Sequence, residues 1–156
     1  MGIVNLTNEQ HSYLTNKMST IVDKYRNIDY VSCIFTSIYK DYFKNGIKHI
    51  DIYIIPTSEN HYDDLKAIVS DVNQEEIYKK TKFLLTVIVE NPKDYKNIKI
   101  MDLVRIDKLN RLRNSEILFD RNNYYENLLE EYKDSIAKCF NIVETNPRIK
   151  IKSKSE

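Results

Sequence analysis

Glycine is almost absent from this chain, and its scarcity excludes one large class of nucleotide sites. Only Gly2 and Gly46 occur among 156 residues. The P-loop and the dinucleotide-binding fingerprint both need several glycines, because their backbones approach phosphate closely. A phosphate site built on such a glycine-rich cradle is therefore excluded.

Cysteine is also scarce, and tryptophan does not occur. The two cysteines, Cys33 and Cys139, stand far apart in apolar surroundings and form no CxxC spacing. This pattern indicates two reduced, buried thiols rather than a disulfide framework or a metal-binding motif.

Long apolar runs and a strong net charge are missing as well. No apolar stretch reaches the roughly 18 residues of a membrane-spanning helix. Residues 1–10 lack the charged and apolar parts of a secretory signal, so we expect a cytoplasmic protein without membrane contact. The formal net charge is +1, which gives no indication of nucleic-acid binding.

The residues that are present are typical of one globular domain. Hydrophobic residues make up 42% of the chain and charged residues 30%, which favours a folded chain over a disordered one. A chain of this length buries enough surface to need neither a disulfide nor a metal. We expect a single domain over residues 1–147 and a flexible polar tail over 148–156.

A helix is predicted near the beginning of the chain. Thr7 and Gln10 have the spacing of a capping box, which places the helix start at residue 7 or 8. Apolar residues then recur at helical spacing, so that one face of the helix is expected to be buried. The residues of this face are Leu14, Met18, Ile21, Val22 and Tyr25.

Three strands are predicted in the first two thirds of the chain, over 30–36, 49–55 and 82–89. All three are rich in β-branched and aromatic residues and end at polar or proline-containing segments. The near-continuous apolar run of 49–55 predicts that both of its faces are buried. Asp51 interrupts this run, and a buried acid needs a hydrogen-bond partner, an opposite charge or a metal.

The remaining elements complete an α/β (α+β) class, with a small mixed sheet flanked by helices. Helices are expected around 62–77 and 107–113, and a short strand is expected over 115–120. The stretch 98–106 could form either a helix or a strand. An apolar stripe from 125 to 143 predicts a long C-terminal amphipathic helix.

The order of helix, strand, Ser37, about a dozen residues and a strand containing Asp51 resembles the minimal nucleotidyltransferase domain. In that family a Gly-Ser pair after the first strand holds nucleotide phosphates. An Asp-x-Asp pair on the second strand holds magnesium, because two acids that are two residues apart share one strand face. Residues 115–120 are similar to a later segment of the family, so the resemblance covers residues 8–130.

The resemblance implies a role for five residues. Thr36 and Ser37 correspond to the nucleotide-binding pair, and His49 and Asp51 to the metal-binding pair. Glu90, at the end of the third strand, is the residue expected to assist Asp51 in catalysis. The cofactor implied is Mg²⁺, and the partners implied are a nucleoside triphosphate and a second protein.

Two departures from the family pattern favour loss of catalysis. Thr36 replaces the glycine, and its side chain fills the space where backbone should approach phosphate. His49 replaces the first carboxylate, and imidazole is a poor ligand for magnesium. The sequence therefore favours a degenerate, non-catalytic nucleotidyltransferase-like protein that acts through nucleotide or protein binding.

Two other functions stay open from the sequence. The first is an active magnesium-dependent nucleotidyltransferase, in which Asp51 acts with Asp41 or Glu90. The second is an interaction module with no relation to nucleotides. Two groups of basic residues are predicted to be solvated surface rather than nucleic-acid sites. They are the lysines among the aromatic residues of 39–48 and the run Arg105, Lys108, Arg111 and Arg113.

Overall fold

The computed structural model of the chain describes residues 6–37, 49–69, 74–98 and 102–145. Within these ranges the chain forms a four-stranded mixed sheet with the strand order β3-β2-β1-β4. The predicted fold class is confirmed. The strands are β1 (Val31–Ser37), β2 (His49–Pro56), β3 (Leu84–Val89) and β4 (Ser115–Asp120).

The sheet combines antiparallel and parallel pairing. Strand β1 pairs antiparallel with both β2 and β4, whereas β2 and β3 run parallel. Parallel neighbours need a crossover connection. Here the crossover contains α3 (Tyr62–Val69) and α4 (Gln74–Thr81), which follow the short 3-10 helix η1 (Glu59–His61).

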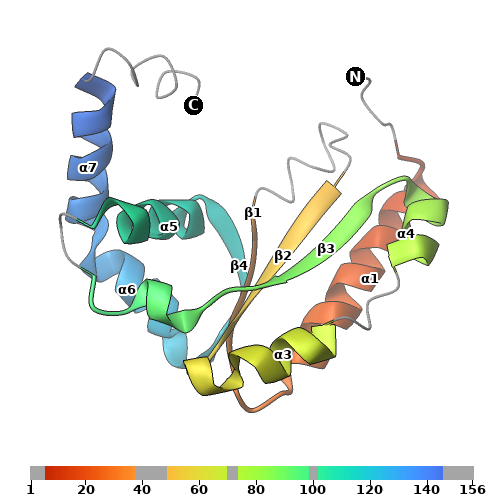
Figure 1. Cartoon of the computed structure of the whole chain (residues 1–156). Coiled ribbons are helices and arrows are strands. Elements are labelled where there is room, and N and C mark those ends of the chain that lie inside the picture. Colours follow the sequence, from red (N-terminus) through yellow and green to blue (C-terminus); the bar gives the residue numbers. More distant parts are fainter. Residues whose placement is uncertain (1–5, 38–48, 70–73, 99–101, 146–156) are drawn as a thin grey trace.

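Helices cover both faces of the sheet (Figure 1). Helix α1 (Asn8–Arg26) lies with α3 and α4 on one face. The other face carries α5 (Leu103–Arg113), α6 (Tyr124–Glu131) and α7 (Lys133–Thr145). Two short 3-10 helices, η2 (Pro92–Tyr95) and η3 (Arg121–Asn123), precede α5 and α6. None of the helices described is long and apolar enough to cross a membrane.

The first helix confirms its prediction. Thr7 accepts a hydrogen bond from the Gln10 amide, and the Gln10 side chain accepts one from the Thr7 amide, so the capping box is complete. All five apolar residues of the predicted face are buried against the sheet. The local signal was sufficient here because cap and apolar stripe agree.

Strand β2 is buried on both faces, as its apolar run predicts. Ile50, Ile52 and Ile54 belong to the apolar cluster that includes α1. Tyr53 and Ile55 belong to the cluster under α5, α6 and α7. The sheet therefore separates two hydrophobic cores.

Strand β3 begins later than predicted. Lys82 was expected to open the strand, but it has a left-handed φ of 64°. Its amide donates to the Tyr78 carbonyl and so ends α4. The strand starts at Leu84, once the chain has left this turn. In the ambiguous stretch 98–106, residues 99–101 lie outside the described part, and α5 begins at Leu103 behind an Asp102 cap.

The prediction of one long C-terminal helix is wrong. Helix α6 ends at Glu131 and α7 begins at Lys133, with Tyr132 at a φ of −102° and a ψ of 11° between them. The backbone at Tyr132 thus leaves the α-helical region. Both helices nevertheless bury apolar side chains in the core around α5. The tail over 148–156 lies outside the described residues, and its flexibility stays a prediction.

Candidate functional site

Ser37 and Asp51 occupy neighbouring positions on paired strands. The last recorded pair of β1 and β2 joins Thr36 to Ile52, so Ser37 and Asp51 are the next residues along the two strands. Ser37 also pairs with Ser115 of β4, and Asp51 pairs with Thr86 of β3. These four positions form a row across the sheet, which we call the Asp51 row. The Ser37 side chain lies outside what the structure describes.

Asp51 is half-buried and lies on the α5 side of the sheet. Side chains alternate along a strand, so Asp51 shares the face of Tyr53 rather than that of Ile50 and Ile52. Thr86, which stands beside Asp51 in the parallel register, is half-buried as well. Asp51 therefore lies at the margin of the second core, where solvent still has access.

Thr36 has a structural role that the sequence did not predict. Its side chain is fully buried, and its hydroxyl donates a hydrogen bond of 2.7 Å to the carbonyl oxygen of Asp51. The hydroxyl thus ties the end of β1 to the strand that carries Asp51. The buried Thr36 side chain offers no surface to a ligand, and nucleotide binding at the Thr36 backbone stays a prediction.

Glu90 does not lie close to Asp51 in the fold. Thr86 is the β3 partner of Asp51, and Glu90 lies four residues beyond Thr86. At about 3.3 Å per residue this places the Glu90 backbone roughly 13 Å along the strand from the Asp51 row. The Glu90 amide donates instead to the Ile54 carbonyl at 2.9 Å. The two acids therefore form no carboxylate pair, and a joint catalytic role loses its geometric basis.

The Glu90 carboxylate belongs to a separate ionic cluster beneath α5. Only 8% of the residue is exposed. Its carboxylate accepts hydrogen bonds from the Tyr95 hydroxyl, at 2.7 Å, and from the Arg111 guanidinium. Lys108 lies 3.8 Å away and also pairs with Asp94 at 2.9 Å. Burial raises the pKa of Tyr95 far above its ordinary value, and the Glu90 charge adds to this rise.

Arg111 is the residue of this face that sequence reasoning missed. Its guanidinium carbon lies 4.5 Å from the centre of the Tyr53 ring and 5.9 Å from that of Phe35. Burial is the largest single influence on the pKa of Arg111 and lowers it, but Glu90, Tyr95 and Tyr53 together outweigh it, so the pKa is raised. The prediction of a solvated basic face is therefore wrong for Arg111. The three-residue spacing of Lys108 and Arg111 was the available signal, since it puts both on one side of a helix.

The described residues do not form the family's magnesium site. Asp51 is the single carboxylate of the Asp51 row, and Thr86 stands at the neighbouring position on β3. No group of three or more His, Cys, Asp or Glu residues that could hold a metal occurs in the described ranges. The His49 side chain and Asp41 fall outside them. Magnesium binding by Asp51 and His49 therefore stays a prediction.

Comparison of the chain with protein-family models, with curated proteins and with solved structures finds no match. The resemblance to nucleotidyltransferase domains accordingly depends on Ser37, Asp51 and the order of elements around them.

Proposed function

We propose that the chain is a nucleotidyltransferase-like domain that binds a nucleoside triphosphate without transferring its nucleotidyl group. The observation that carries this proposal is the register of β1 and β2, in which Ser37 and Asp51 are the next positions after a recorded pair. A phosphate-binding turn and an acid-bearing strand must lie side by side for this family's site. The register supports that arrangement.

The composition of the Asp51 row favours binding over catalysis. Transfer of a nucleotidyl group in this family depends on metal ions held by two or more acids. The row offers one acid, and Glu90 is engaged with Tyr95 and Arg111. A single acid beside a hydroxyl supports recognition of a nucleotide and gives no support for the transfer step.

Nucleotide binding is tested by isothermal titration of ATP, GTP, CTP and UTP, each with and without Mg²⁺. We expect one of them to bind the wild-type chain, and Ser37→Ala to weaken its binding about tenfold, through loss of a hydrogen bond to a charged phosphate. Ser58→Ala is the matched control, because Ser58 makes no side-chain capping hydrogen bond. This control should bind the nucleotide as the wild type does.

Two results would contradict the proposal in different ways. Formation of a nucleotidylated product by the wild type, lost in Asp51→Ala, would establish an active enzyme. Absence of binding by all four nucleotides would leave protein contact as the remaining function of the domain.

A further inference from the structure

A polar pocket of about 380 Å³ lies at the end of the sheet away from the Asp51 row. Ser32 lines it from the start of β1, and Thr57 from the residue that follows β2. Arg121 and Asn122 contribute from the turn after β4. The volume is within the range of small-molecule sites, which is roughly 300–1,000 Å³.

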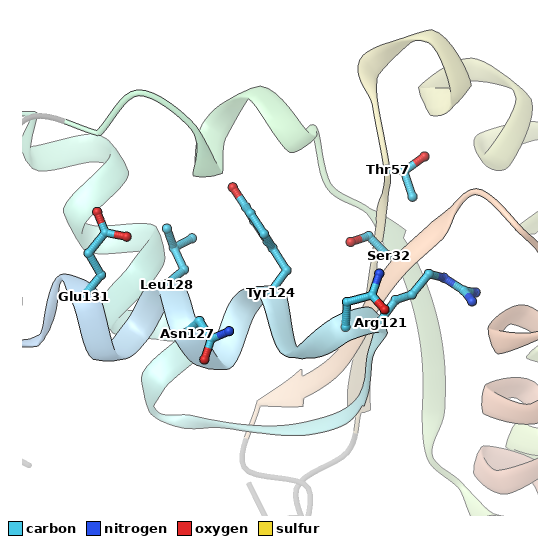
Figure 2. A pocket seen from close by; sticks show the side chains of 8 residues that line it. Ser32, Thr57, Arg121, Tyr124, Asn127, Leu128 and Glu131 are labelled. Atoms are coloured by element: carbon cyan, nitrogen blue, oxygen red, sulfur yellow. The ribbon is translucent and has the colours of Figure 1, made fainter.

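One face of α6 forms the longest wall of the pocket. Tyr124, Asn127, Leu128 and Glu131 line it, and their spacing of three, four and seven residues places them on one side of the helix. Tyr124, Leu128 and Glu131 project from the same side of α6, with Ser32 and Thr57 beyond Tyr124 at the strand ends (Figure 2). Seven of the eight lining residues carry a polar atom in the side chain.

The turn that leads into α6 is held in a fixed conformation. Asn122 and Asn123 both have left-handed backbone angles, with φ values of 60° and 55°. Asparagine accepts this region more readily than most residues. Asp120 accepts hydrogen bonds from the Tyr125 and Glu126 amides, so the start of α6 is already satisfied without a ligand.

Among the described lining residues, the basic side chain is already hydrogen-bonded within the fold. This residue, Arg121, donates to the carbonyl oxygens of Val31, Arg26 and Ile28, at 2.9, 3.0 and 3.2 Å. The guanidinium is thereby used to hold β1 to the turn after α1. Arg121 keeps its positive charge, because these carbonyl oxygens are neutral, but the N–H groups that donate to them are not available to hold a phosphate.

Two lining groups attract a cation instead. Glu131 is exposed, and no ion pair to it occurs in the part of the chain that the structure describes. Tyr124 is 43% exposed, so its ring is accessible to a ligand. A carboxylate attracts an ammonium group by charge, and an aromatic face attracts it through its quadrupole.

The spacing of these two groups selects the shape of the ligand. Tyr124 and Glu131 are seven residues apart, which is about 10.5 Å along the helix axis. A linear ligand with two ammonium groups matches this separation along the helix. We propose that this pocket binds a linear organic cation of the diamine or polyamine class, with one ammonium on Glu131 and another over Tyr124. Leu128 stands between these two groups and would face the methylene chain that links the ammonium groups.

Spermidine is the probe for this proposal, titrated into ¹⁵N-labelled full-length chain at constant ionic strength. We expect the amide signals of residues 121–131 to shift. Glu131→Gln should weaken binding about fivefold, and Tyr124→Leu about threefold. Tyr124→Phe should bind spermidine normally, since it keeps the ring. Ethylenediamine, which is too short to reach both groups, should bind at least about tenfold more weakly.

Glu130→Gln is the matched control, because it makes the same charge change one residue away. Glu130 pairs with Lys133 at the surface and does not line the pocket. An equal loss in Glu130→Gln and Glu131→Gln would mean unspecific charge attraction and overturn the proposal. Binding of sorbitol in preference to spermidine would overturn it in favour of a neutral polyol. Neither result depends on Ser37 or Asp51, so failure here is distinguishable from failure at the nucleotide site.

Discussion

At the scale of single residues, the contact of Arg111 with Glu90 is the one whose loss is expected to change the free energy of unfolding most. The Glu90 carboxylate is almost fully buried, and Arg111 and Tyr95 both donate to it. A buried charge that loses its partner costs more than the pair contributes, because the remaining charge is left without compensation. The pair is thus better understood as fixing α5 against β3 than as catalytic machinery.

We predict that Arg111→Met lowers the free energy of unfolding by about 2 kcal/mol, since Lys108 compensates the Glu90 charge only in part. The double variant Glu90→Gln/Arg111→Met should lose less than the sum of the two single variants. Urea unfolding followed by circular dichroism measures all three values. Strict additivity would show that the two side chains do not interact in solution.

At the scale of elements, the sequence predicted those helices and strands whose position depends on neighbouring residues alone. The capping box and apolar stripe of α1, and the β-branched runs of β1 and β2, were sufficient to place these elements. The break at Tyr132 was not predictable, because the apolar stripe continues across it and residues on both sides pack into the core around α5. The left-handed backbone at Lys82 was likewise not predictable, because the turn contains no glycine or asparagine, the residues that usually indicate a positive φ.

The N-terminal cap of α1 gives a quantitative test at this scale. We predict that Thr7→Ala lowers the free energy of unfolding by about 1 kcal/mol, because the Gln10 amide loses its acceptor. Thr20→Ala is the matched control, since Thr20 lies within the helix and its hydroxyl donates to the Asn16 carbonyl. That change should cost much less. Equal losses in the two variants, measured by urea unfolding, would remove the energetic importance of the cap.

At the scale of the whole molecule, the sheet brings together residues that the sequence alone could not relate. The proximity of Ser37 and Asp51 was predictable, because Ser37 ends β1, Asp51 lies near the start of β2, and the two strands follow one another. The separation of Glu90 from Asp51 was not, because it depends on the register of the parallel pair β2 and β3. The contact of Arg111 with Tyr53 depends on how α5 crosses the sheet, which periodicity does not specify.

Buried protonated groups give the whole molecule a predictable response to alkaline pH. Burial is the main cause that raises the pKa of Cys33, Tyr95 and Tyr125 above their ordinary values. These groups therefore keep their protons in the folded state at pH values where the unfolded chain loses them. Such stabilisation is complete below the ordinary pKa and is lost as pH rises.

We predict that the free energy of unfolding falls as pH rises past about 9, by up to about 1.4 kcal/mol per pH unit for each such proton. Urea unfolding between pH 8 and pH 11 measures this slope, and Cys33→Ala should reduce it in the lower part of the range. A free energy that stays constant to pH 11 would mean that these groups are solvated in the folded chain.

The most direct test of the proposed function is an amide NMR titration of the ¹⁵N-labelled chain with its best-binding nucleoside triphosphate. We predict that the largest shifts fall on the Asp51 row, at Ser37, Asp51, Thr86 and Ser115. The Ser37→Ala variant should show the same shifts only at about tenfold higher nucleotide concentration. A titration that leaves these four amides unchanged, or that moves only residues distant from them, would contradict a nucleotide site between β1 and β2.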